Sequence, residues 1–204
     1  MTVFAILNYG VGNLRSISKA LEKVGVKPKI TSNPEDILAS DALILPGVGA
    51  FKGALSKVRE MEACLRTFIE SKRPVLGICL GLQLLFKRSF EGGLNKGLGY
   101  ISGDVVKLPN TVKIPHIGWN TVKIRRADRL LEGLRDGCYM YFVHSYIAQV
   151  NSEEEDVVLA TTEYGVPFPS VVKKHNVYAT QFHPEKSGRS GLKLLENFAR
   201  LTRT

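Results

Sequence analysis

The first ninety residues alternate short apolar runs with stretches that are apolar at every third or fourth position. Three apolar runs are typical of buried strands: Val3–Leu7, Ala42–Leu45 and Pro74–Ile78. Three other stretches have the spacing of amphipathic helices: Asn13–Val24, Phe51–Ser71 (with breaks allowed) and Leu80–Phe86. Gly25 follows the first of these helices, where a glycine commonly ends one. Strands that alternate with helices predict a parallel sheet covered on both faces.

Beyond Gly92 the pattern changes to short strand-like segments separated by turns. These segments are Val105–Leu108, Thr121–Ile124, Tyr139–Val143, Val157–Thr161, Val171–Lys173 and Val177–Phe182. A last helix is predicted near Gly191–Leu201, where apolar residues recur at helical spacing. The chain is therefore expected to be a single domain over residues 1–204 of the α/β class. Its central sheet should be mixed and largely parallel, with helices on both faces.

The composition is that of a folded protein, with 44% hydrophobic and 23% charged residues. Lys and Arg number 28 against 19 Asp and Glu, a formal charge of +9. The basic residues are scattered rather than gathered beside aromatic residues, which favours solubility or an acidic partner over nucleic acid. The uncharged run Pro74–Phe86 is shorter than the roughly 20 residues of a membrane helix. The amino terminus carries no export signal, so a cytoplasmic protein is expected.

The motif Gly77–Gly81, which reads Gly-Ile-Cys-Leu-Gly, lies between a predicted strand and a predicted helix. This is the layout of a nucleophile elbow with Cys79 in place of serine. The turn would hold the sulfur at the carboxyl edge of the sheet, where the helix N-terminus favours a thiolate and the Leu80 amide faces an oxyanion. The alternative is a small buried hydrophobic cysteine. That alternative is preferred for Cys64 and Cys138, and the absence of Cys-x-x-Cys pairs argues against disulfides and zinc.

A cysteine nucleophile needs a base, and the chain has four histidines. His183 precedes a proline, which favours extended backbone, so Glu185 should project to the same side and hold its ring. The alternatives are a turn at a strand end for His183 and a solvated acid for Glu185. His144 is a rival base, although its apolar strand is more typical of a core or site-lining histidine. His116 and His175 have no such context, and no histidine pair has metal-ligand spacing, so no metal is expected.

The turn Pro46–Gly49 follows a predicted strand at the same sheet edge as Cys79. Its glycines permit a peptide orientation whose N–H points at a developing oxyanion, although a Pro-Gly turn alone is a weak signal. The glycines of Gly10–Arg15 do not complete a dinucleotide fingerprint, and the chain holds no phosphate-binding loop motif. No cofactor is therefore expected.

Together, the motifs Pro46–Gly49, Gly77–Gln83 and His183–Glu185 resemble the signatures of the class I (triad) glutamine amidotransferases, and the resemblance runs from end to end. Further segments resemble the glutaminase subunits that serve histidine biosynthesis: Asn8–Leu14, Pro115–Asn120, Tyr141–Tyr146 and His183–Ser187. The resemblance implies the class I amidotransferase fold and glutamine as the substrate.

The resemblance also implies a reaction. Cys79 attacks the side-chain amide of glutamine, His183 protonates the departing ammonia, and water then releases glutamate from a thioester. Three residues of the family supply oxyanion contacts and match Val48, Gly49 and Leu80. The family's positions for substrate binding match Gly47, Gln83, Glu91, His144 and Ser145.

In these relatives the ammonia passes to a (β/α)8-barrel cyclase subunit in a heterodimer. The cyclase joins it to a nucleotide, giving imidazole glycerol phosphate and aminoimidazole carboxamide ribotide. Four residues match positions at or near that partner's face: Asn13, Trp119, Tyr141 and Lys186.

Three alternatives stay open. In the first, the chain is a glutaminase for an anthranilate, purine or pyridoxal phosphate synthase; the segments Pro115–Asn120 and Asn8–Leu14 disfavour this. In the second, the chain is a cysteine hydrolase of peptides or small amides; the presence of Gln83 disfavours this. In the third, the chain is a non-enzymatic regulatory subunit with a decayed site; the intact Cys79, His183 and Glu185 disfavour this.

Overall fold

The computed structural model describes residues 2–10 and 13–203, so Val11 and Gly12 of the segment Asn8–Leu14 lie outside the described residues. Within them, nine strands form one sheet in the order β2-β1-β3-β4-β13-β12-β11-β8-β9. The strands are β1 (Val3–Leu7), β2 (Lys27–Thr31), β3 (Ala42–Leu45), β4 (Val75–Ile78), β8 (His116–Ile124), β9 (Cys138–His144), β11 (Val158–Tyr164), β12 (Val166–Lys174) and β13 (Val177–Thr180). From β2 to β13 the neighbours pair in parallel, and beyond β13 they pair antiparallel.

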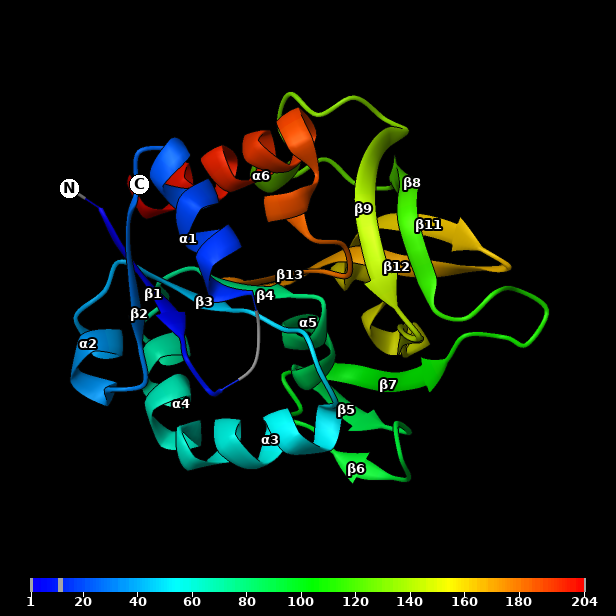
Figure 1. The fold of residues 1–204 in the computed structure, drawn as a ribbon, viewed down its shortest axis with the longest axis horizontal. Coiled ribbons are helices and arrows are strands. Elements are labelled where there is room, and N and C mark those ends of the chain that lie inside the picture. The colour runs from blue at the N-terminus through cyan, green and yellow to red at the C-terminus, as the bar shows by residue number, and fades with distance from the viewer. Residues whose placement is uncertain (1, 11–12, 204) are drawn as a thin grey trace.

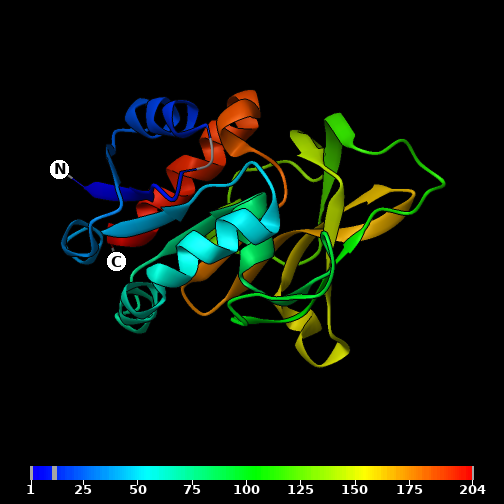
Figure 2. The same cartoon turned by 60° about the horizontal axis from the view of Figure 1, so that its bottom comes forward.

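A second sheet of four strands, in the order β10-β7-β5-β6, packs beside the first in the described part of the chain. Its strands are β5 (Phe86–Ser89), β6 (Asn95–Lys96), β7 (Ile101–Lys107) and β10 (Tyr146–Val150). The antiparallel strands lie on the side of the molecule away from both chain ends, as the two views in Figure 1 and Figure 2 agree. The predicted division into a parallel and a more antiparallel half is confirmed.

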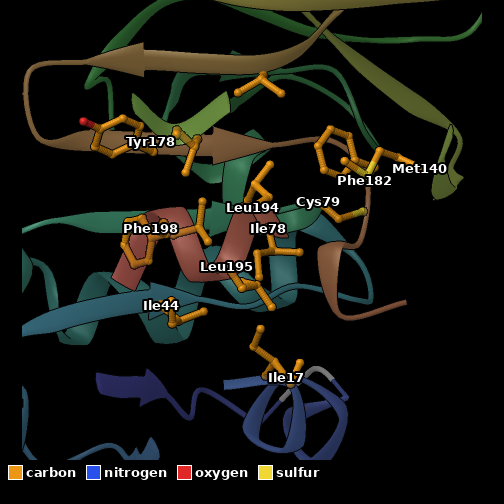
Figure 3. Packing of buried hydrophobic residues seen from close by; sticks show 14 of the residues in the cluster. Ile17, Ile44, Ile78, Cys79, Met140, Tyr178, Phe182, Leu194, Leu195 and Phe198 are labelled. Atoms are coloured by element: carbon orange, nitrogen blue, oxygen red, sulfur yellow. The ribbon is translucent and has the colours of Figure 1, made fainter. Parts of the chain in front are cut away.

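Helices cover both faces of the parallel part of the large sheet (Figure 1). They are α1 (Leu14–Lys23), α2 (Pro34–Leu38), α3 (Phe51–Glu60), α4 (Glu62–Glu70), α5 (Leu80–Leu84) and α6 (Gly188–Arg200). The short 3-10 turns are η1 (Arg129–Leu131), η2 (Ser152–Val157), η3 (Pro184–Lys186) and η4 (Leu201–Arg203). One core cluster lies under α1 and α6, and a second lies under α2 to α5. Figure 3 shows Cys79 at one end of the first cluster, beside Phe182 and Met140.

Several predicted elements differ from the structure in length. The predicted helix Leu80–Phe86 ends at Leu84, because Phe86 begins β5 and joins the second sheet. The stretch predicted as Phe51–Ser71 is two helices that meet at Met61. The predicted strand Val177–Phe182 ends at Thr180, and β2, α2, β5, β6 and β10 were not predicted at all.

The parallel pairing brings three segments together at one edge of the sheet. β4 lies between β3 and β13, with Leu45 opposite Gly77 and Thr180 opposite Ile78. The carboxyl ends of these strands therefore meet, and ligands of open α/β sheets bind at such edges. The segments that leave this edge are the Pro46–Gly49 turn, the Cys79 elbow and the stretch that carries His183.

Candidate active site

The elbow places Cys79 in a backbone conformation that L-residues seldom adopt, with φ 52° and ψ −104°. Such a conformation costs on the order of 1–3 kcal/mol and persists only where the surroundings enforce it. Here the Cys79 N–H donates to the Thr180 carbonyl at 2.7 Å. A Cβ on Gly77 would lie 2.8 Å from the Gly81 carbonyl oxygen, so the tight turn requires glycine. The side chain that results is buried, with 6% of Cys79 exposed.

The Pro46–Gly49 turn packs against this elbow. A Cβ on Gly47 would collide with Leu80 and would come within 2.6 Å of the Gly81 nitrogen. Gly49 has φ 120°, a conformation that favours glycine. Gly47 therefore lets the turn approach the elbow closely, and Gly49 permits the backbone conformation of the turn.

His183 and Glu185 form a buried pair. His183 has φ −98° and ψ 97°, the extended backbone expected before a proline. Its Nδ1–H donates to Oε1 of Glu185 at 2.8 Å, and the two side chains are only 2% and 5% exposed. Burial lowers the pKa of His183, but Cys79 and Glu185 outweigh it and raise that pKa to about 10. The imidazole Nε2 has no hydrogen-bond partner among the described residues and is left for a reacting group.

A cavity of about 330 Å³ opens beside the sulfur of Cys79. Its lining is Val48, Gly49, Cys79, Leu80, Gln83, Glu91, Pro115, Val143, His144, Ser145 and Tyr146. All of the predicted oxyanion and substrate-binding residues except Gly47 are in this set. His183 and Glu185 are not, because they are covered by the chain around them.

Two amide side chains connect the sulfur to the cavity wall. Gln83 donates from Nε2 to the Tyr146 carbonyl at 3.0 Å, and it lies 3.4 Å from Oε1 of Gln181. Gln181 in turn donates from Nε2 to the Cys79 sulfur at 3.7 Å. Sequence reasoning missed Gln181. Its position two residues before His183 was the available local signal, although the chain bends at Gln181 and Phe182, so the spacing does not show what the side chain contacts.

His144 belongs to a second, neutral network. Its Nδ1 lies 3.0 Å from the Tyr146 carbonyl, which can only accept, so Nδ1 carries the proton. Its Nε2 then accepts from Nδ1–H of His116 at 3.0 Å. Burial and the neighbouring His116 lower the pKa of His144 to about 3, and burial lowers that of His116 to about 4. His144 is therefore a hydrogen-bonded, site-lining histidine, and His175 lies in an exposed turn, at φ 54°.

Glu91 lies in the loop between β5 and β6, at the wall of the cavity. Burial raises the pKa of its carboxyl, while a backbone hydrogen bond from Phe51 lowers it in part. A half-buried carboxylate without a cationic partner among the described residues suits a positively charged group of a ligand.

The predicted partner residues share one exposed surface. Trp119 is 53% exposed and packs edge-to-face on Tyr141, with ring centroids 5.8 Å apart. The Lys186 ammonium lies 6.0 Å from the centre of the Tyr141 ring. Asn13 caps α1, which packs against the η3 turn that contains Lys186. Ile117 and Tyr139, also exposed, extend this surface along β8 and β9.

Other features of the described residues do not compete with this site. A hollow of about 650 Å³ is larger, but its lining contains no cysteine or serine; it includes Glu70, Lys72, Arg129, Lys173, His175 and Tyr178. No cluster of three or more His, Cys, Asp or Glu side chains in the described ranges is arranged to hold a metal ion. No helix of residues 2–10 and 13–203 is long and apolar enough to cross a membrane.

A cysteine on a strained elbow beside a buried His–Glu pair, at the carboxyl edge of an α/β sheet, is the arrangement of a triad-type cysteine enzyme. The chain matches the class I glutamine amidotransferases over residues 5–201 and belongs to this family. It is 50% identical over 201 residues to "Imidazole glycerol phosphate synthase subunit HisH" of Caldanaerobacter subterraneus subsp. tengcongensis, with 98% of each chain covered. It is likewise 50% identical to the protein of the same name from Archaeoglobus fulgidus, with 98% of this chain and all of that one covered.

Solved structures share the fold at low sequence identity. PurLQS from Thermotoga maritima superposes with a TM-score of 0.76 at 18% identity, covering 98% of both chains. The glutaminase domain of Trypanosoma brucei CTPS superposes with a TM-score of 0.69 at 15% identity, covering 98% of this chain and 94% of that one. The predicted class I amidotransferase fold is confirmed.

Proposed function

We propose that the chain is the glutaminase subunit of an imidazole glycerol phosphate synthase. It hydrolyses glutamine to glutamate and ammonia, and it delivers the ammonia to a (β/α)8 cyclase subunit of histidine biosynthesis. The observation that carries this proposal is Cys79 on its elbow, electrostatically coupled to the His183–Glu185 pair, in a chain half identical to subunits of that synthase over its whole length.

The reaction follows from these groups. The Cys79 sulfur attacks the amide carbonyl of glutamine, and backbone amides near Val48 and Leu80 stabilise the oxyanion. The His183 imidazolium gives its proton to the departing nitrogen, so ammonia leaves and a glutamyl thioester remains. His183, now neutral, takes a proton from water, which attacks the thioester and releases glutamate. Glu185 keeps the ring oriented and stabilises its charge throughout.

The cavity supports glutamine as the substrate. Gln83 uses its NH2 group on Tyr146 and Gln181, which leaves Oε1 as its remaining polar atom. An amide oxygen and the Glu91 carboxylate can both accept hydrogen bonds from the substrate's ammonium. The backbone beside His144 and Ser145 would hold the other end of the substrate.

The cyclase would dock on the surface around Trp119, Tyr141 and Lys186, to which Asn13 adds the N-terminus of α1. Exposed aromatic residues are enriched in protein interfaces, and the Lys186 ammonium would complement an acidic partner. Because ammonia must not escape, docking here would close the site. The cytoplasmic location and the absence of a cofactor stay predictions.

The test is glutamate release from glutamine by the chain mixed with a barrel cyclase and its nucleotide ligand, with the chain alone and Cys79→Ala as controls. Activity in the mixture that Cys79→Ala abolishes supports the proposal. Silence in the mixture, with turnover beside an anthranilate, purine or pyridoxal phosphate synthase partner, would reassign the pathway. Peptide cleavage without glutamine hydrolysis would point to a cysteine hydrolase.

A further inference from the structure

The side-chain amide of Gln181 lies between the nucleophile and the wall of the glutamine cavity, and the reaction above assigns it no role. Gln181 follows β13 and is completely buried, with 0% exposed. Its Nε2 is 3.7 Å from the Cys79 sulfur, and its Oε1 is 3.4 Å from Nε2 of Gln83. Burying a primary amide costs free energy unless its donors and acceptors find partners, so these two contacts fix its position.

The orientation of this amide follows from a backbone carbonyl. The Tyr146 oxygen can only accept a hydrogen bond, so the Gln83 atom 3.0 Å from it is the Nε2 donor. The atom of Gln181 that meets this donor must then be the acceptor Oε1. That assignment turns the NH2 group of Gln181 toward Cys79, so the hydrogen bond runs from the amide to the sulfur.

The sulfur thus has two polar neighbours of opposite character. The Val143 carbonyl, 3.5 Å away, can only accept and so suits the protonated thiol. The Gln181 NH2 group can only donate and so suits the thiolate. Because a hydrogen bond to an anion is stronger than one to a neutral acceptor, Gln181 should shift the balance toward the thiolate.

We propose that Gln181 is a positioning residue that donates a hydrogen bond to the Cys79 thiolate and, through its oxygen, holds Gln83 at the cavity. One buried amide then keeps the nucleophile and a substrate contact in a fixed relation. The part concerning Gln83 rests on the proposed glutaminase function, whereas the part concerning the sulfur does not.

The test measures how fast iodoacetamide alkylates Cys79 in the full chain as a function of pH, read by mass spectrometry of the Cys79 peptide. Gln181→Met keeps the length of the side chain and removes the donor. We expect the alkylation rate at pH 7 to fall about tenfold, because the donor that favours the thiolate is lost. In the complex, the same variant should lower kcat and raise KM for glutamine.

The matched control is Thr162→Val, which replaces another buried polar residue whose hydroxyl has no partner among the described residues. Its alkylation profile should equal that of the wild-type chain. If Gln181→Met does not fold, Gln181→Glu keeps the size of the side chain and places an acceptor and a negative charge beside the sulfur, so it should move the profile at least as far.

An unchanged Cys79 profile in Gln181→Met, or an equal shift in Thr162→Val, would overturn this proposal. Failure of the proposed function looks different. In that case the wild-type chain releases no glutamate beside the cyclase, while the alkylation profiles of wild type and Gln181→Met still separate.

Discussion

Two buried histidines lie close to the nucleophile, and their partners make one a cation and keep the other neutral at pH 7. His183 faces Cys79 and the Glu185 carboxylate, which together outweigh burial and raise its pKa to about 10. His144 lines the cavity, faces the neutral His116, and has its pKa lowered to about 3. Both are almost completely buried, at 2% and 6% exposed.

Burial therefore does not decide which histidine does acid–base work. It favours the neutral form of both rings, and only an anionic partner reverses it. A histidine held as a cation at neutral pH can give a proton to departing ammonia, whereas one held neutral can only fix hydrogen bonds. The charged one is the catalytic candidate and the neutral one is part of the wall.

The largest effect should separate these two roles. His183→Ala should lower glutamate release by the complex by about 10⁴-fold, because the acid and base are both lost. His144→Gln should lose no more than about tenfold. Cys79→Ala, with an unchanged circular dichroism spectrum, sets the floor of the assay. Comparable losses in the two histidine variants would break the comparison.

Removing the Glu185 carboxylate tests why the pKa of His183 is raised. Glu185→Gln should lower the pKa of His183 below about 10 and reduce activity about 10²-fold, less than His183→Ala does. Proton NMR of the imidazole across pH measures the first, and steady-state kinetics the second. If Glu185→Gln is as inactive as His183→Ala, orientation matters as much as proton transfer.

Stability should depend on pH in opposite directions at the two sites. The folded-state pKa of His144, about 3, lies below its ordinary 6.5, so acid favours the unfolded chain as the pH falls below 6.5. This should cost about 2 kcal/mol of unfolding free energy between pH 7 and pH 5. The stabilisation from His183 is instead full below pH 6.5 and is lost as the pH rises toward about 10.

Urea unfolding of wild type and His144→Gln at pH 5 and pH 7 measures the acid effect. The variant should lose less stability on acidification than the wild type. His116 titrates in the same direction in both chains, so the difference between them isolates His144. Equal acid sensitivity would show that His144 is not held neutral.

The smallest effect concerns the exposed surface around Trp119, Tyr141 and Lys186. The turn that follows His183 contains Lys186. His144 is hydrogen-bonded to His116, and the His116 ring contacts Asn120, the neighbour of Trp119 in the chain. If the partner's face is acidic, Lys186→Ala should slow association about two- to threefold and weaken its salt dependence. Trp119→Ala should mainly speed dissociation. Association rates that do not change with salt would show that charge does not contribute to docking of the partner.

The triad could be predicted from the sequence because each member lies in a short motif. A glycine elbow positions Cys79. His183 is positioned by its two neighbours along the chain, Pro184 and Glu185. Gln181 and Gln83 are different, since they are 98 residues apart and meet only because β4 pairs with β13. Spacing along the chain carries no signal of such a contact.

The missed elements have a similar explanation. Strand β2 lies at the edge of the sheet, and Lys27 and Lys29 are exposed, so it lacks the apolar run by which buried strands are predicted. Phe86 extended the apolar pattern of the helix before it, although it packs in the second sheet. Apolar runs show that a segment is buried, but tertiary pairing decides whether it is helix or strand.

The two edges of the large sheet also bear on how the protein behaves at high concentration. Open strand edges recruit other chains, and proline and lysine on an edge discourage this. Strand β2 carries both, at Lys27, Pro28 and Lys29. At the opposite edge, the backbone of Tyr141 is already occupied: His183 N–H donates to its carbonyl at 2.9 Å, and the Ser187 hydroxyl accepts from its N–H at 2.9 Å. The turn that carries the catalytic histidine thus also covers part of an aggregation-prone edge, and loosening it would reduce solubility as well as turnover.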